Sequence, residues 1–411
     1  MSKQPLLARL GSAKSKGMRS VMMVTGGDSS ASFGDLLQKN PNMHREALIR
    51  SEARRLVMKV STYGPAPAVA TSPNGSFMLL GSYALMLVHL HSGETLSLLS
   101  NMQLAVKRRA VDAAAPDGLL QWTHCCVSDD DSLAAACSGP LLVVYDVLPN
   151  ADSGAPPRCT EIATLDMGAD AVDCALGPLG AGGQRYVAAC DASGAAQLWS
   201  LGGGGTSAGG PAVRLEPTAP LHCLCLVDVS TVVLGGSGGL RIWDPHGGPA
   251  FHGMQGAARD PARLRAGEAF GAAGEVQRVS YAESPTHSTA CVVSCEAACK
   301  VRMWDVRTGD LLVELTTPEG APKCAWLGRG GRWALTLSGR SALRVFDVRS
   351  AAPVDVAALG DAAVHLWCGA ALSPDNRWLL GLGVTRMGAW EVIAIEVTPP
   401  LDDRPAVTDA I

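Results

Sequence analysis

Aromatic residues are scarce in this chain of 411 residues, where they make up 5%, while glycine occurs 46 times. Turns and strands of small residues are therefore expected in preference to long amphipathic helices. Charge is also low, at 18% of residues, and the formal net charge is −4. Because no long-range positive field exists to attract a phosphate backbone, the sequence predicts no nucleic-acid partner.

The chain lacks an unbroken apolar stretch long enough to span a membrane. Residues 60–91 carry no Lys, Arg, Asp or Glu, but prolines, glycines and serines interrupt them, so we expect no membrane partner. No secretory apolar region precedes the 13 cysteines, which favours a reducing compartment. We expect a cytoplasmic protein, with the nucleus as a second location. Residues 1–27 hold five basic residues and no acid, so organellar import is the alternative.

Two motifs that could indicate catalysis or a metal site lack the context that the chemistry needs. Ser237 in GGSGG has the spacing of a nucleophile elbow, but here it falls in a predicted hairpin turn and not between a strand and a helix. Cys291, Cys295 and Cys299 lack the close pairs and fourth ligand typical of zinc sites. No phosphate-binding loop is present. We therefore expect no metal, no cofactor and no enzymatic activity.

The chain contains one short sequence motif that is repeated several times. VRMWDVRTGD (301–310) and LRVFDVR (343–349) place Trp304 and Phe346 42 positions apart. Weaker copies bring the total to seven, with a period in the forties that is lengthened by Gly/Ala/Pro-rich insertions at 101–120, 149–160 and 246–275. The residues at the aromatic position are Val88, Tyr145, Trp199, Trp243, Trp304, Phe346 and Trp390. In the last copy, Ile395-Glu396 is an alternative to Trp390-Glu391.

Each copy belongs to a longer unit. A short apolar strand, a turn and a second strand precede the aromatic position, and a further strand follows it. The turns include SPNG (72–75), SDDD (128–131) and SPDN (373–376). Each unit predicts a four-stranded antiparallel sheet. Since one such sheet cannot bury both faces, we expect the sheets to stack, and a radial arrangement protects their edges.

These repeats resemble those of the WD-repeat β-propeller family over residues 55–398. The resemblance implies an all-β fold, namely a seven-bladed β-propeller with a short N-terminal helical extension. The Gly-His pair that family members often carry ahead of the innermost strand is missing from every unit. The buried hydrogen-bond network of that family is therefore not implied for this chain.

The segment RRLVMKVS (54–61) has strand composition but no unit of its own. We interpret it as the fourth strand of the last blade, a clasp that joins the two ends of the repeat region. Residues 32–54 predict two short helices. The predicted organisation is a disordered basic tail (1–31), a helix-loop-helix extension (32–54), the propeller (55–398) and a C-terminal tail (399–411).

The basic triplet and the recurrent cysteines each have a structural and a functional interpretation. Lys107, Arg108 and Arg109 form a basic triplet in the connection before blade 2, where we expect a solvated loop, and an acidic partner is the alternative. Cysteines recur in the predicted innermost strands of five blades, which favours packing in one small buried slot over metal binding. These are Cys126, Cys174, Cys225, Cys324 and Cys368.

The two strongest copies both end in Asp-Val-Arg. Asp305 with Arg307 and Asp347 with Arg349 resemble the consecutive pairs of WD-repeat substrate receptors of cullin-RING ubiquitin ligases. That resemblance implies that the arginines dock the ligase's adaptor subunit, and the alternative is that each arginine pairs within its own blade. These four residues and the basic triplet are the candidate partner-binding residues.

The sequence as a whole favours a non-catalytic scaffold that binds other proteins within a multiprotein assembly. A ligase substrate receptor is the second hypothesis. An enzyme or a small-ligand-binding propeller is the third, and it belongs to another class. The fold does not decide among them.

Overall fold

The structure is a computed structural model of the whole chain. It describes residues 22–24, 55–59, 68–82, 84–89, 94–111, 121–148, 156–177, 184–202, 213–217, 219–228, 231–245, 251–253, 275–284, 289–306, 309–327, 331–338, 343–354, 364–372, 378–385 and 390–396. In these segments no helix is long and apolar enough to cross a membrane. The predicted helix-loop-helix at 32–54 and the C-terminal tail at 399–411 lie outside them, and those domain boundaries stay predictions.

Strands in the described segments form seven antiparallel sheets, as the repeat predicts. Blade 1 contains β3 (Ala68–Thr71), β4 (Phe77–Gly81), β5 (Leu85–His89) and β6 (Thr95–Leu99), and helix α3 (Asn101–Val111) follows it. Blade 2 contains β7 (His124–Val127), β8 (Leu133–Ser138), β9 (Leu141–Leu148) and β10 (Arg158–Asp166). Blade 3 contains β11 (Ala171–Leu176), β12 (Arg185–Asp191), β13 (Ala196–Leu201) and β14 (Val213–Leu215).

The remaining blades follow the same order. Blade 4 contains β15 (Leu221–Asp228), β16 (Thr231–Gly236), β17 (Gly239–Trp243) and β18 (Phe251–Gly253). Blade 5 contains β19 (Val276–Ser284), β20 (Thr289–Glu296), β21 (Lys300–Asp305) and β22 (Leu311–Thr316). Blade 6 contains β23 (Pro322–Leu327), β24 (Trp333–Ser338), β25 (Leu343–Asp347) and β26 (Ala352–Val354). Blade 7 contains β27 (Val364–Leu372), β28 (Trp378–Thr385) and β29 (Trp390–Glu396).

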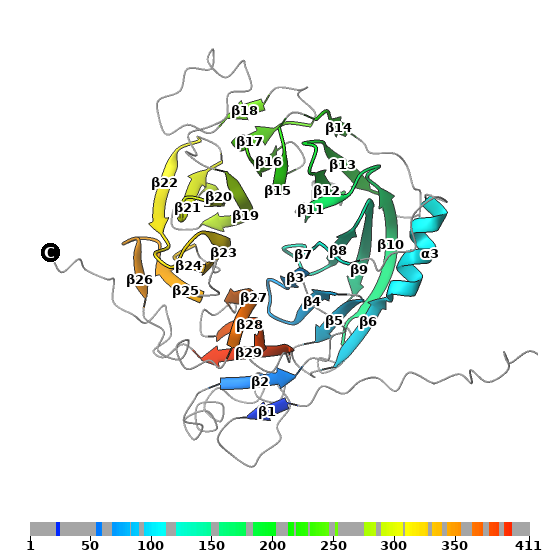
Figure 1. The fold of residues 1–411 in the computed structure, drawn as a ribbon, viewed down its shortest axis with the longest axis horizontal. Helices are drawn as coiled ribbons and strands as arrows, with labels where there is room; N and C mark the ends of the chain where they lie inside the picture. The colour runs from blue at the N-terminus through cyan, green and yellow to red at the C-terminus, as the bar shows by residue number, and fades with distance from the viewer. Residues whose placement is uncertain are drawn as a thin grey trace, which may run out of the picture.

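The sheets are arranged radially, with the first strand of each blade nearest the centre (Figure 1). The fold is therefore an all-β propeller. Its fourth strand in blade 7 is β2 (Arg55–Lys59), which pairs antiparallel with β29, as the clasp interpretation predicts. A further strand, β1 (Met22–Val24), pairs with the outer side of β2. Sequence analysis does not predict β1, since it falls in the segment interpreted as a tail.

The hydrophobic core is divided into layers between successive blades, which explains why the sequence motif is repeated. The residue at the aromatic position is buried against the preceding blade. Tyr145, for example, packs with blade 1 residues, and Trp304 packs with blade 4 residues. The indole Nε1–H of Trp304 also donates to Ser294 Oγ at 2.9 Å. One large apolar side chain per blade, in a fixed place, fills each interblade layer.

Strand register settles which residue holds this place in the last blade. In blade 5, Trp304 lies opposite Val292, the second apolar residue of the neighbouring strand CVVSCE. The equivalent residue of blade 7 is Leu379 in WLLGLG, and it lies opposite Ile395. Ile395 is therefore the anchor of blade 7, and Trp390 lies at the start of the same strand.

Candidate functional site

Helix α3 connects blades 1 and 2, where sequence analysis predicts a solvated loop, and that prediction is wrong for residues 101–111. A capping box starts the helix. The Ser100 Oγ accepts the Gln103 backbone N–H at 3.3 Å, and the Gln103 Oε1 accepts the Ser100 backbone N–H at 2.9 Å. Leu104 is fully buried in the layer between blades 1 and 2. The cap and this single apolar anchor fix the helix on the outer side of the propeller.

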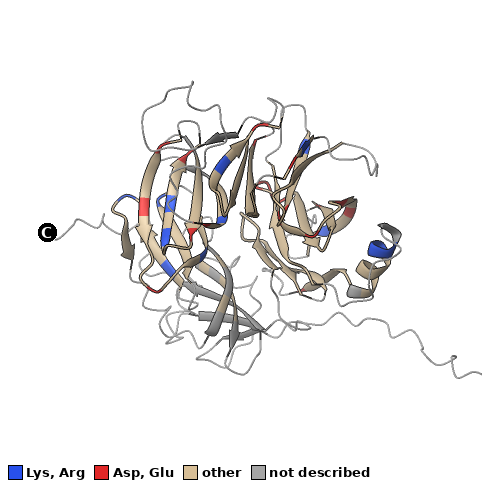
Figure 2. Ribbon diagram, turned by 45° about the horizontal axis from the view of Figure 1, so that its top comes forward, with Lys and Arg blue, Asp and Glu red and all other residues tan. Residues whose placement is uncertain are grey.

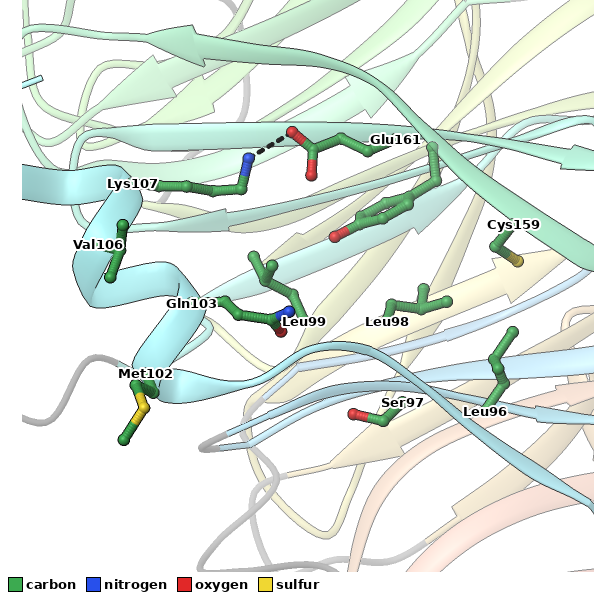
Figure 3. A pocket seen from close by; sticks show the side chains of 11 residues that line it. Leu96, Ser97, Leu98, Leu99, Met102, Gln103, Val106, Lys107, Cys159 and Glu161 are labelled. Carbon is green, nitrogen blue, oxygen red and sulfur yellow. Dashed lines mark hydrogen bonds and ion pairs between the residues drawn. The ribbon is translucent and has the colours of Figure 1, made fainter. Parts of the chain in front are cut away.

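A groove of about 580 Å³ lies between α3 and the outer strands of blades 1 and 2 (Figure 3). Strand β6 forms one wall, β10 forms the other, and the side chain of Tyr145 from β9 lies between them. Both wall strands are irregular: β6 has a bulge at Leu98, and β10 has one at Ile162. Bulges in outer strands redirect side chains and interrupt the row of backbone groups that a further strand would pair with.

Polar groups line part of the groove. Lys107 Nζ donates to Glu161 Oε1 at 2.5 Å and to Thr164 Oγ1 at 3.3 Å, which ties α3 to β10 (Figure 3). Tyr145 is only 3% exposed, yet its hydroxyl has no hydrogen-bond partner among the described residues. Burial, together with the charge of Glu161, raises the pKa of Tyr145 well above its usual value. The hydroxyl is therefore a protonated donor without an acceptor, which is costly in a buried place.

The outer lip of the groove is apolar. Met102 is 80% exposed and Val106 is 63% exposed, the two largest exposures among large hydrophobic residues of the described segments. They are four positions apart on α3 and so share one face of the helix. Leu96 and Leu98 line the opposite wall from β6. An exposed apolar lip beside a buried polar donor is typical of a binding surface.

The basic triplet lies on the helix that forms one side of this site. Lys107, Arg108 and Arg109 are in the second half of α3, which has no acidic residue in its first turn. The side chains of Arg108 and Arg109 lie in the last turn, where cations interact favourably with the helix dipole. Figure 2 shows basic residues on this helix at the outer rim of the molecule. Of the triplet, Lys107 lines the groove, and its charge is paired with that of Glu161.

A second polar cluster lies among the innermost strands of blades 2 to 5. Asp173 is 1% exposed and accepts hydrogen bonds from Cys174 N, Leu224 N, Arg278 Nη1 and His124 Nε2 at 2.8 to 3.1 Å. Arg278 Nη2 also lies 2.7 Å from His124 Nε2 and 3.0 Å from His124 Nδ1. Because a guanidinium only donates, a ring nitrogen that accepts from it carries no proton, and the imidazole is neutral.

The protonation states in this cluster follow from burial and charge. Burial is the largest influence on His124, and together with the charge of Arg278 it lowers the pKa of the imidazole. Burial opposes ionisation of Asp173, but Arg278 and His124 overcome it and hold the pKa of the carboxyl below its usual range. The cluster therefore links strands β7, β11, β15 and β19 through one buried carboxylate. The carboxylate of Asp173 is satisfied by donors from the protein itself, which indicates a structural role.

The Asp-Val-Arg residues are only partly described. Asp347 is fully buried; its Oδ2 accepts Arg332 Nη2 at 3.2 Å, and its Oδ1 accepts the backbone N–H of Arg349 at 3.0 Å. Arg349 itself is exposed, and no ion pair of its side chain is formed with a described residue. Asp305 is also buried, at 6% exposure. Arg307 lies outside the described residues, so the paired arrangement stays a prediction.

The cysteine prediction is right about the strands and wrong about a single slot. Cys126, Cys174, Cys225, Cys324 and Cys368 all lie in innermost strands. Their registers differ, however. Cys126 pairs with Ala135, one residue after the partner of the blade 2 anchor Tyr145. Cys174 pairs with Ala189, two residues after the partner of the blade 3 anchor Trp199. No group of three or more potential ligands is placed to hold a metal in the described part of the chain. Ser237 lies in the turn between β16 and β17, as predicted.

Comparisons with known proteins bear on the fold. No protein-family model matches the chain, and no curated protein matches it. Among solved structures 1506 chains match. One belongs to the crystal structure of a mitotic checkpoint complex, with 14% sequence identity and a TM-score of 0.54 over 83% of this chain and 94% of that chain. At that identity the similarity shows the propeller fold alone, and a fold shared so widely does not select a function.

Proposed function

We propose that the protein is a non-catalytic scaffold that binds other proteins within a larger assembly. The observation that carries the proposal is the groove between blades 1 and 2, where the apolar lip of α3 stands beside the unpartnered donor of Tyr145. Burying a hydroxyl without an acceptor is unfavourable, and exposing Met102 to water is also unfavourable. A bound protein that covers this surface removes the exposure of the apolar lip.

The propeller architecture supports the proposal. Its strands are held by interblade layers and by the pairing of β2 with β29, so the outer surface is fixed by a rigid interior. Binding residues on a rigid scaffold lose little conformational entropy when a partner docks. The similarity to a propeller from a multiprotein complex agrees with this proposal at the level of the fold.

Co-purification tests the proposal. Full-length tagged protein is recovered from its native cells under conditions that preserve weak complexes, and the eluate is analysed by size-exclusion chromatography with mass spectrometry. We expect at least one protein at a fixed ratio to the chain, eluting with it as one species. Recovery of the chain alone, together with turnover of a small molecule by the purified chain, would contradict a scaffold function and favour the enzyme hypothesis.

One observation favours the second candidate, a cullin-ligase substrate receptor. The buried carboxylate of Asp347 pairs with Arg332 and orders the turn, which leaves the Arg349 side chain exposed at the end of the blade 6 strand. An exposed arginine on an ordered turn can donate two parallel hydrogen bonds to a carboxylate of a docking protein. The same co-purification decides this candidate, because it requires an adaptor subunit of the ligase in the eluate.

A further inference from the structure

We propose that Cys126 and Cys174 form a reversible disulfide between blades 2 and 3 when a peroxide oxidises the protein. The inference assigns a modification site on the inner strands of the propeller. It goes beyond the scaffold function and does not depend on it or on the groove. Three observations carry it: the contact between the two sulfur atoms, the buried link beside them, and the unequal exposure of the two thiols.

The two sulfur atoms already touch. Cys126 Sγ lies 3.7 Å from Cys174 Sγ, and both residues carry a free thiol. Cys126 belongs to β7 and Cys174 to β11, which are neighbours around the centre of the propeller (Figure 1). Because a disulfide bond is about 2.05 Å long, the sulfur atoms need to approach by less than about 2 Å. Modest rotations of two short side chains provide such a movement.

The polar cluster around Asp173 holds the two strands at this separation. His124 precedes Cys126 by two residues on β7, and Asp173 directly precedes Cys174 on β11. His124 Nε2 lies 2.9 Å from Asp173 Oδ1, and both side chains are buried. The buried link therefore keeps the two thiols in contact before any oxidation takes place. Two groups that are held together in this way react as an intramolecular pair.

Unequal exposure decides the order of the steps. Cys126 is partly exposed, whereas Cys174 is 1% exposed. Hydrogen peroxide is only slightly larger than water, so it reaches Cys126 first. Hydrogen bonding to Cys126 and to Cys137, together with burial, raises the pKa of the Cys174 thiol well above its usual value. Since the thiolate is the reactive form, Cys174 is a poor target for peroxide and acts second, as the resolving thiol.

The reaction balances with one peroxide. The Cys126 thiolate attacks a peroxide oxygen, the O–O bond breaks, and a sulfenic acid and hydroxide form. The Cys174 thiolate then attacks the sulfenic sulfur, so that the S–S bond forms and the S–O bond breaks. The hydroxide that leaves takes up the proton that Cys174 released. Two thiols are thus oxidised to one disulfide while hydrogen peroxide is reduced to two waters, and a thiol reductant reverses the change by exchange.

Cys137 is the competing partner for Cys174. It is fully buried, so peroxide does not reach it. Its sulfur lies 3.4 Å from Thr123 Oγ1 and 3.8 Å from the backbone oxygen of His124. Both contacts are made with residues next to or within its own blade. The disulfide is therefore expected to join Cys174 to Cys126 and not to Cys137.

Peptide mapping after oxidation tests the proposal. The reduced full-length protein is treated with hydrogen peroxide, remaining thiols are alkylated, and the digest is analysed by mass spectrometry without reduction. We expect a disulfide between Cys126 and Cys174 within one chain, and its loss after dithiothreitol. Met102, at 80% exposure, should become a sulfoxide and shows that the peroxide has acted. Alkylated Cys126 and Cys174 in the same digest as oxidised Met102 would overturn the proposal.

Two variants identify the roles of the thiols. Cys174→Ser removes the resolving thiol, so the sulfenic acid at Cys126 should advance to a sulfinic acid, seen as a gain of two oxygen atoms. Cys159→Ser replaces another partly exposed cysteine, in the outer strand β10, and should leave the disulfide unchanged. A disulfide from Cys126 to Cys137 in the Cys174→Ser protein would contradict the assignment, because the pairing would then not follow the sulfur contact.

Discussion

Asp173→Asn is the substitution with the clearest expected effect on stability. The asparagine has the shape of aspartate and retains an oxygen that can accept the Leu224 N–H. It removes the negative charge that faces Arg278 and His124. The arginine is then left in the protein interior without its counter-ion.

The magnitude follows from burial. Removing one partner of a buried ion pair costs about 3–5 kcal/mol. Because the side chain of Arg278 is 30% exposed, water reaches it, and we expect about 2–4 kcal/mol here. At about 2 °C per kcal/mol for a chain of this size, the melting temperature falls by roughly 4–8 °C.

Thermal unfolding followed by circular dichroism at pH 7.5 measures the effect. Arg185→Gln is the control, since Arg185 lies 3.9 Å from Asp130 and from Asp146 at the surface and should cost under about 1 kcal/mol. The pKa of Asp173 is lowered in the folded state, so its contribution is complete above the unfolded pKa of 3.8 and is lost as the pH falls through the folded value. A difference under about 1 °C from wild type at pH 7.5 would refute the structural role of the cluster.

Three further predictions concern other parts of the chain. Burial raises the pKa of Asp131 to about 6, so the folded state prefers the protonated form and loses stability as the pH rises through that value. Asparagine also suits the left-handed φ of 59° at this position. Asp131→Asn should therefore stabilise the protein by about 1 kcal/mol at pH 7.5 and not at pH 4.5, as measured by thermal melting. Deleting residues 1–61 should remove the clasp strand and give a protein that aggregates, as measured by light scattering. Deleting residues 1–20 keeps both β1 and β2 and should be tolerated. Equal melting temperatures for the two truncated proteins would contradict the clasp interpretation. Arg307→Glu with Arg349→Glu should abolish co-purification with a cullin-ligase adaptor at an unchanged melting temperature, and absence of that adaptor from wild-type eluates would end the ligase hypothesis.

The repeat made the fold predictable because its period is set by packing. One anchor per blade fills one interblade layer, so the anchor positions along the sequence locate the sheets. The clasp was predictable for a related reason. A segment with strand composition that belongs to no repeat unit is available to pair with the open edge of a blade, and Arg55–Lys59 pairs with blade 7. The position of Ile395 needed the register, since Trp390 matches the aromatic pattern better.

The groove was missed because its helix lies in a segment whose average composition suggested a loop. The signal was local: Ser100 and Gln103 have the spacing of a capping box, and neither glycine nor proline occurs between 101 and 111. The sequence showed the basic triplet, but it was expected in a loop and not in a helix. Low aromatic content and the glycine-rich composition of the whole chain outweighed that signal.

The cluster around Asp173 was missed because it depends on register between blades. His124, Asp173, Cys223 and Arg278 lie opposite equivalent residues of the second strands, which are Cys137, Cys190, Gly235 and Cys295. A bulge immediately precedes this position in blades 3, 4 and 5. Sequence spacing alone does not locate a bulge, so it could not show that these polar side chains share one position and meet.

Site-specific photo-crosslinking of the assembled complex tests the central claim that the groove holds a partner protein. A benzophenone amino acid replaces Met102 in one sample and Leu311 in another, and the full-length proteins are irradiated after co-purification with their partners. We expect a crosslink to one partner from position 102 and none from position 311. Crosslinks from position 311 but not from position 102 would contradict the account.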